Sequence, residues 1–265
     1  MFDVTKIDHS AWDRPEIISA VFHPRPDPAP ETPAGAQDLF IEAENRTSLM
    51  ARVHQAASDA PNILFFHGNG EIVADYDQLG SVYTDLGLTF IPVDYRGYGQ
   101  SNGSPSITAM LRDAHLVLDF VQNWLLEQGR NGPLLVMGRS LGSAPALELA
   151  CTRQHEFQAL IIESGFAYAL PLLRLLGVEV QGLGLEESQG FNNVHKMAQV
   201  QLPTLVIHAQ WDHIISLAEG QTLYEVCTAQ DKEFLEIPGA NHNDIFLRDL
   251  QRYMATIKKL ADRLL

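Results

Sequence analysis

The chain has 265 residues, 46% of them hydrophobic, and a formal net charge of −15 at pH 7. This length and apolar content allow a large core in a single domain, and the negative charge argues against a nucleic-acid partner. The apolar runs fall short of the roughly 18 to 20 residues that span a bilayer. The first eight residues lack the basic region and apolar core of a signal peptide, so we expect a cytoplasmic protein without a membrane anchor.

The first 36 residues are the least regular part of the sequence. Five prolines between positions 24 and 33 predict an extended, polyproline-like segment that lies over the body of the domain. The apolar segment 17–22 is expected to pack on the core, with a role in a pocket wall as the alternative. We therefore expect residues 1–36 to be an extension packed against a domain that spans residues 37–265.

Short apolar strands alternate with helical patterns after this extension. Segments 40–42 and 48–53 predict an antiparallel hairpin at one edge of a sheet. Apolar runs predict six further strands, around residues 63–66, 89–93, 134–137, 159–162, 204–207 and 234–237. Strands that are apolar throughout and separated by helices predict an α/β fold, with a mostly parallel sheet of about eight strands covered on both faces.

Helical spacing and capping residues mark the segments between the strands. Ser104 and Pro105 look like a cap and first residue of one helix, and Ser216 and Glu219 like a capping box that opens another. Pro92 falls inside an expected strand, which requires a bulge or the end of that strand. The two cysteines, Cys151 and Cys227, lie in expected helices without metal-ligand spacing. We therefore expect both to be reduced and to have no catalytic or metal-binding role.

The pentapeptide Gly138-Arg139-Ser140-Leu141-Gly142 joins an expected strand to a small-residue helix. A serine on such a sharp turn has a strained backbone, and its hydroxyl stands clear of the sheet. The turn also directs the N–H of Leu141 toward the serine oxygen, where negative charge would develop during acyl transfer. We therefore predict Ser140 as the nucleophile and the Leu141 amide as one oxyanion donor.

Ligands of such sheets bind at the carboxyl ends of the strands. The strand at 63–66 ends in His67-Gly68-Asn69-Gly70, where two glycines allow close approach of the backbone, so the N–H of Asn69 is the expected second oxyanion donor. Asp212 and His242 follow the last two strands and are expected at the same edge of the sheet as Ser140. Glu163, at the end of the strand before them, is the alternative to Asp212 as the acid that would orient a histidine.

Other polar residues at these strand ends are expected to have structural roles. His67 is interpreted as a packing and hydrogen-bonding residue. Asp94 and Arg96 are expected to fix the loop 94–101 through charge-assisted hydrogen bonds.

Together, the serine pentapeptide, the His-Gly-Asn-Gly loop and the Asp-x-Arg-Gly-x-Gly-x-Ser loop at 94–101 resemble α/β-hydrolase-fold serine hydrolases over about residues 37–265. The chain is similar to the small-capped branch, which includes depalmitoylase-like α/β-hydrolase-domain proteins and prolyl-oligopeptidase-type catalytic domains. The resemblance implies an α/β-hydrolase fold with a short cap at about 165–201. It also implies a triad of Ser140, Asp212 and His242, with no metal or organic cofactor.

The leucine-rich segment 166–176 either walls an acyl groove or packs as an ordinary helix. The candidate pocket residues are Phe166, Tyr168 and Leu172 from this segment, with Arg139 from the serine pentapeptide. We predict a serine hydrolase that cleaves esters or thioesters of small-molecule or acylated substrates. A prolyl-oligopeptidase-type peptidase and a non-catalytic hydrolase-fold binding protein are the alternatives. The natural substrate and the oligomeric state stay open.

Overall fold

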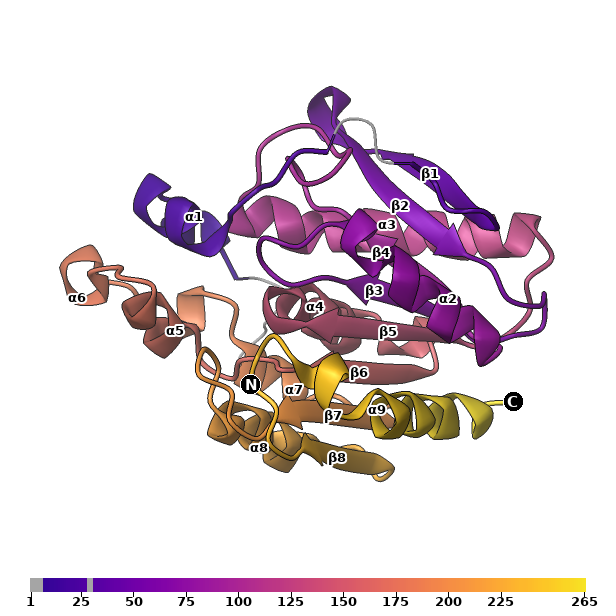
Figure 1. The fold of residues 1–265 in the computed structure, drawn as a ribbon. Coiled ribbons are helices and arrows are strands. Elements are labelled where there is room, and N and C mark those ends of the chain that lie inside the picture. Colours follow the sequence, from indigo (N-terminus) through magenta and orange to yellow (C-terminus); the bar gives the residue numbers. More distant parts are fainter. Residues whose placement is uncertain (1–6, 28–30) are drawn as a thin grey trace.

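The computed structural model describes residues 7–27 and 31–265, and it contains an eight-stranded sheet in the order β1-β2-β4-β3-β5-β6-β7-β8 (Figure 1). The predicted hairpin forms one edge, and β2 is also antiparallel to β4; the remaining neighbours are parallel. The strands are β1 (Ala36–Glu42), β2 (Ser48–His54), β3 (Asn62–Phe66), β4 (Thr89–Val93), β5 (Leu134–Arg139), β6 (Ala159–Glu163), β7 (Thr204–Ala209) and β8 (Lys232–Ile237). The predicted α/β class and mixed sheet are confirmed.

Helices cover both faces of this sheet (Figure 1). The α-helices of the described residues are α1 (Pro15–Val21), α2 (Asp77–Asp85), α3 (Ile107–Glu127), α4 (Ser143–Thr152), α5 (Ala169–Leu175), α6 (Val180–Leu183), α7 (Asn193–Met197), α8 (Leu217–Val226) and α9 (Ile245–Asp262). Short 3-10 turns are η2 (His9–Trp12), η3 (Glu44–Arg46), η4 (Val73–Tyr76), η5 (Ser140–Gly142), η6 (Gln154–Glu156) and η7 (Glu187–Gln189). Within this part of the chain, no helix has both the length and the apolarity needed to cross a bilayer.

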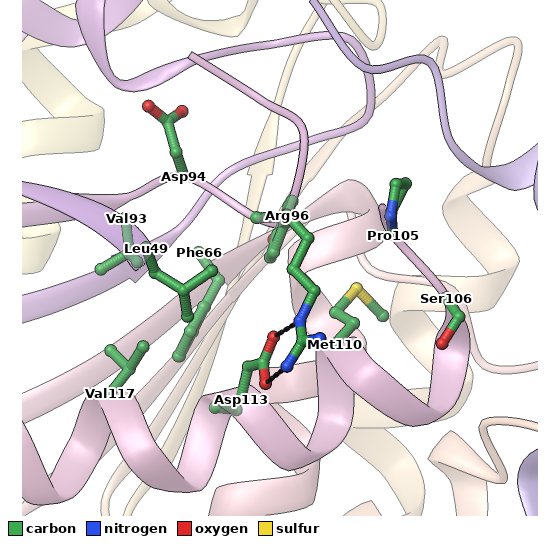
Figure 2. A pocket seen from close by; sticks show the side chains of 12 residues that line it. Leu49, Phe66, Val93, Asp94, Arg96, Pro105, Ser106, Met110, Asp113 and Val117 are labelled. Atoms are coloured by element: carbon green, nitrogen blue, oxygen red, sulfur yellow. Dashed lines mark hydrogen bonds and ion pairs between the residues drawn. The ribbon is translucent and has the colours of Figure 1, made fainter. Parts of the chain in front are cut away.

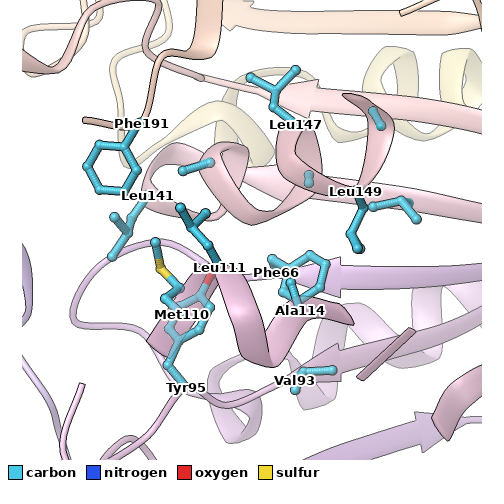
Figure 3. Packing of buried hydrophobic residues seen from close by; sticks show 14 of the residues in the cluster. Phe66, Val93, Tyr95, Met110, Leu111, Ala114, Leu141, Leu147, Leu149 and Phe191 are labelled. Atoms are coloured by element: carbon cyan, nitrogen blue, oxygen red, sulfur yellow. The ribbon is translucent and has the colours of Figure 1, made fainter. Parts of the chain in front are cut away.

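The core has two halves, one on each face of the sheet. Successive strand residues point to opposite faces, so Phe66 of β3 joins the half covered by α3, α4 and α8, while Phe65 joins the half covered by α2 and α9. Figure 3 shows Phe66 in the first half, among Leu111 and Ala114 of α3 and Leu149 of α4. Because the strands are buried on both faces, they read as continuous apolar runs.

The loop after β4 is fixed to the rest of the domain by charged groups. Arg96 pairs with Asp113 of α3 through two hydrogen bonds, at 2.6 Å and 2.7 Å (Figure 2). Asp94 accepts the amide of Val73 at 2.9 Å. Both residues are buried, and their contacts fit the structural roles expected for them.

Pro92 is tolerated because it lies next to the end of β4. It pairs with Phe65 in the parallel ladder to β3, and the pairing of β4 with β2 runs only through Phe90 and Val93 on either side of it. The missing N–H of proline therefore falls where the ladder to β2 is interrupted.

Helix α3 begins two residues later than predicted. Ser106, and not Ser104, is its N-cap residue, and the Ser106 hydroxyl accepts the amide of Ala109 at 3.1 Å. The carboxylate of Asp13 accepts the amide of Ile107 at 2.8 Å. The Ser106 hydroxyl and the Asp13 carboxylate therefore each satisfy a free amide in the first turn of α3. Asp13 lies far from this helix in the sequence.

Helix α8 follows Ser216 as predicted, but Glu219 does not complete a capping box. Its carboxylate instead accepts the amides of Ala167 and Tyr168, at 2.8 Å and 2.9 Å. The expected local contact is therefore replaced by one that fixes the start of the cap segment.

That cap consists of the short helices α5, α6 and α7 between β6 and β7, in the region expected at about 165–201. The N-terminal extension lies beside it, with α1 against α5 (Figure 1). Trp12 of the extension is fully buried and packs edge-on against Phe191 at 6.1 Å between ring centres. Residues 1–6, and residues 28–30 of the proline-rich segment, lie outside the described part of the chain.

Candidate active site

Ser140 lies on a sharp turn between β5 and α4. Its φ of 51° is in the left-handed region, which is strained for a residue with a side chain. A Cβ at Gly138 would collide with the carbonyl oxygen of Gly142, and a Cβ at Gly142 would collide with that of Phe66. Gly138 is therefore required because the turn folds back on itself, and Gly142 because the turn packs against the end of β3.

His242 connects this serine to a carboxylate. Its Nε2 lies 3.0 Å from Ser140 Oγ, and its Nδ1 lies 2.7 Å from Asp212 Oδ2. The other Asp212 oxygen accepts the amides of Ile214 and Ile215, at 3.0 Å and 2.8 Å. Burial opposes ionisation of Asp212, but the hydrogen bonds from His242 and these amides outweigh it and hold the pKa of Asp212 below its usual value. The three side chains predicted as a triad are thus brought together.

Glu163, the alternative acid, is engaged elsewhere. One carboxylate oxygen accepts Arg139 Nε at 3.1 Å, and the other accepts the Tyr253 hydroxyl at 2.7 Å. Burial raises the pKa of Glu163. Both oxygens therefore have partners other than the imidazole that Asp212 contacts.

A cavity of about 270 Å³ opens beside Ser140. Asn69, Leu141 and His242 line it together with the serine, so both predicted amide donors belong to residues at the site. Its apolar wall comes from the N-terminal extension and the cap, with Val21, Phe166, Leu172, Leu173, Leu176 and Phe191. The Ser140 hydroxyl therefore lies beside a cavity with an apolar wall.

Comparison with known proteins identifies relatives of this chain. A family model described as "Serine aminopeptidase, S33" matches residues 58–178. The chain is 30% identical to α/β hydrolase domain-containing protein 17B of Xenopus laevis over 209 residues, which cover 73% of this chain and 66% of that protein. The human protein 17B is 29% identical over 212 residues, with 76% and 66% covered. The chain thus spans just under two thirds of the length of these relatives.

Solved structures share the fold. An esterase of Pyrococcus furiosus has a TM-score of 0.72 at 16% identity, covering 91% of this chain and 98% of that one. Mouse α/β hydrolase domain-containing protein 10 has a TM-score of 0.67 at 19% identity, covering 86% and 100%. The chain has the α/β-hydrolase fold, and its relatives are α/β hydrolase domain-containing proteins.

Within this fold, the predicted pocket residues separate into two groups. Arg139, Phe166 and Leu172 line the cavity, whereas Tyr168 does not. The Tyr168 side chain is 42% exposed and lines a separate surface hollow. Ala169, the first residue of α5, is buried and lines the cavity, whereas Tyr168 directly before it points outward.

Sequence reasoning missed the cavity residue Phe191 and left Val21 as the less favoured alternative for its segment. Both are buried apolar residues from parts of the chain far from the serine. The available signal for Val21 was its helical spacing: Ile17 and Val21 are four residues apart and lie on one face of α1, and both are buried.

Two further histidines near the site have local partners. His208 is buried, its Nε2 lies 2.8 Å from the carbonyl oxygen of Ile215, and burial lowers its pKa. The His67 ring packs against Tyr95 and Tyr98, with centres 4.5 Å and 5.5 Å away. The position of His67 fits the packing and hydrogen-bonding role expected of it.

The side chain of Asn69 is held by residues far from it in the sequence. Its Oδ1 accepts the amide of His23 and the hydroxyl of Tyr98, both at 2.8 Å. Its Nδ2 lies 2.7 Å from Nδ1 of His23. The N-terminal extension therefore fixes the loop that carries the candidate oxyanion donor.

Proposed function

We propose that this chain is a serine hydrolase that cleaves carboxylic esters or thioesters through an acyl-enzyme at Ser140. The observation that carries the proposal is the hydrogen-bonded series Asp212–His242–Ser140 beside a cavity with an apolar wall. Such a series activates a hydroxyl that is otherwise a weak nucleophile.

The reaction follows from this geometry. Neutral His242 accepts the Ser140 proton as the hydroxyl oxygen attacks the acyl carbon, and the imidazolium formed is stabilised by Asp212. The amides of Asn69 and Leu141 would donate to the oxyanion. His242 then gives its proton to the departing alcohol or thiol. A water molecule, deprotonated by the same imidazole, releases the acid and restores the serine.

The walls of the cavity favour an apolar acyl group. Leu172, Leu173 and Phe191 offer hydrocarbon surface that an acyl chain would bury. The cationic side chain on the wall, Arg139, is paired with Glu71 and Glu163, so its charge is already compensated. An uncharged acyl chain therefore fits these walls better than an anionic substrate does.

A serine peptidase or amidase is the second candidate, because the matching family model is described as a serine aminopeptidase. An aminopeptidase must hold the ammonium group of its substrate, which calls for an available carboxylate. Glu71 on the cavity wall is instead engaged by Arg139, by the Tyr76 hydroxyl and by the amide of Gly68. This engagement favours ester or thioester cleavage.

The test compares purified wild-type protein with Ser140→Ala on three substrate sets: nitrophenyl esters from acetyl to palmitoyl, the matching thioesters, and aminoacyl anilides. We expect wild-type turnover of esters and thioesters, and a loss of at least about 10³-fold in kcat/KM for Ser140→Ala with an unchanged circular dichroism spectrum. Ordinary ester turnover by Ser140→Ala would refute the mechanism. Turnover confined to the anilides would favour the peptidase.

A further inference from the structure

The Arg139 side chain connects three of the loops that carry candidate catalytic groups, namely the Ser140 turn, the Asn69 loop and the His242 loop. Its guanidinium is buried at the wall of the cavity and has a partner on each nitrogen. Nε donates to Glu163 at 3.1 Å, Nη2 donates to the carbonyl oxygen of His242 at 2.8 Å, and Nη1 pairs with Glu71. Arg139 is also the residue directly before Ser140.

Each of these partners holds a different part of the site. The Glu71 carboxylate accepts the amide of Gly68 at 2.6 Å, one residue before Asn69 in the candidate oxyanion loop. The carbonyl group of His242 belongs to the loop that carries the imidazole. Arg139 thus joins the serine turn to both loops.

Gly68 shows how closely the ion pair between Arg139 and Glu71 packs against the Asn69 loop. A Cβ there would lie 2.7 Å from Arg139 Nη1 and 2.8 Å from a Glu71 oxygen. The backbone of the loop therefore rests directly on the pair between Arg139 and Glu71. A displacement of the guanidinium would move the backbone beside Asn69.

Glu163 is the third partner that holds the guanidinium of Arg139. Glu163 is fully buried, and its second oxygen accepts the hydroxyl of Tyr253 in α9 at 2.7 Å. The chain of contacts therefore runs from the oxyanion loop through Arg139 and Glu163 to the helix that follows the His242 loop.

We propose that Arg139 is a positioning residue that sets the His242 loop and the Asn69 loop in register with Ser140. The proposal rests on the function proposed above. A guanidinium suits this task because its planar fork donates in several fixed directions, whereas a lysine ammonium is a single point of charge on a flexible stem. A positive charge at position 139 is then insufficient to hold the two loops, because the hydrogen-bond donors must also point in the right directions.

The main test is Arg139→Lys, which keeps the charge and removes the fork. We expect kcat on the best nitrophenyl ester to fall about 10²-fold, as for a catalytic group displaced by about 1 Å. KM should stay within about threefold, because the apolar wall is unchanged. The rate of fluorophosphonate labelling at Ser140 should fall in parallel with kcat.

The matched control is Arg52→Lys. Arg52 is also buried and also forms a two-bond pair with a carboxylate, on Asp38, but its pair lies between β2 and β1 at the edge of the sheet. We expect a lower thermal midpoint and a kcat within about twofold of wild type, since this pair is separate from the site. A merely structural role of Arg139 would make the two variants behave alike.

Glu163→Gln is the second variant in case Arg139→Lys does not fold. It is nearly isosteric and removes one of the two charges that hold the guanidinium, so we expect a fall in kcat of about tenfold at similar KM. A folded Arg139→Lys, or failing that a folded Glu163→Gln, with wild-type kcat and labelling rate would overturn the proposal. Absence of Ser140 labelling in the wild type would instead overturn the proposed function.

Discussion

His23 and Asn69 lie 46 residues apart in the sequence and are joined by a pair of contacts: the amide of His23 donates to Oδ1 of Asn69 at 2.8 Å, and the ring nitrogen Nδ1 lies 2.7 Å from the Asn69 Nδ2. The side chain of the candidate oxyanion residue is therefore held by the N-terminal extension. The extension is thereby part of the site, and it also contributes Val21 to the cavity wall.

Replacing His23 tests this link. In His23→Ala the ring contact is lost while the backbone amide remains, so the Asn69 loop is held less firmly. We expect kcat to fall by about tenfold with little change in KM, because a misplaced oxyanion donor costs less than a missing one. The measurement is steady-state turnover of a nitrophenyl ester.

Arg25→Ala is the control for this prediction. Arg25 lies two residues further along the same segment and pairs with Asp75 at the surface, where the side chains are 51% and 40% exposed. Exposed pairs contribute little, so its kcat should stay within about twofold of wild type. Equal effects of the two substitutions would mean that the whole segment, rather than the contact with Asn69, matters.

The apolar cavity predicts a change in acyl-chain preference for Leu172→Trp. Leu172 lines the cavity, and a larger ring there shortens the space available to an acyl chain. We expect kcat/KM to fall by about tenfold or more for long-chain esters and by less than about twofold for acetyl esters. The measurement is the chain-length profile from acetyl to palmitoyl.

Leu175→Trp is the matched change on the same helix. Leu175 is 60% exposed and does not line the cavity, so the profile should match that of wild type. If the two variants shift the profile equally, the acyl chain does not bind between α5 and the serine.

A buried ion pair predicts how stability depends on pH. Lys196 of α7 is fully buried with its Nζ 2.7 Å from Glu148 of α4. Burial opposes ionisation of Glu148, but the hydrogen bond from His115 and the charge of Lys196 prevail and lower the pKa of Glu148 to about 2. This contribution to stability is complete above the unfolded value of 4.5 and is lost as the pH falls from there toward 2. It is on the order of 3 kcal/mol.

Glu148→Gln tests this dependence by urea unfolding between pH 3 and 7. We expect destabilisation by about 3 to 5 kcal/mol at pH 7, since the ammonium of Lys196 stays buried without its partner, and a smaller loss of stability on acidification. Glu156→Gln, in a partly exposed pair with Arg153, should cost about 1 kcal/mol or less. An acid dependence that is unchanged in Glu148→Gln would show that other carboxylates cause it.

The features that the sequence predicts are the local ones. Ser140, Asp212 and His242 each follow a strand, and parallel strands bring their carboxyl ends to one edge of the sheet, so their proximity could be inferred without coordinates. The choice of Asp212 and His242 among the acids and histidines at that edge came from the resemblance to α/β hydrolases. The edge hairpin and the six further strands were predictable for the same reason. Each depends on a pattern within a few neighbouring residues.

The features that could not be predicted depend on partners far away in the sequence. Arg139 lies 68 residues from Glu71 and 103 from His242, and no local pattern marks these contacts. Glu219 has the spacing of a capping box but binds the cap segment instead. Tyr168 and Leu172 look equally suitable for a pocket wall, and only the direction in which α5 begins separates them.

The most direct test of the account is covalent labelling with a fluorophosphonate probe, followed by mass spectrometry of the labelled peptide. The geometry predicts one adduct on wild-type protein, at Ser140, none on Ser140→Ala, and labelling slowed by at least about 10³-fold in His242→Ala. Folded wild-type protein that stays unlabelled, or that carries the adduct on another serine, would contradict the assignment of Ser140 as the nucleophile.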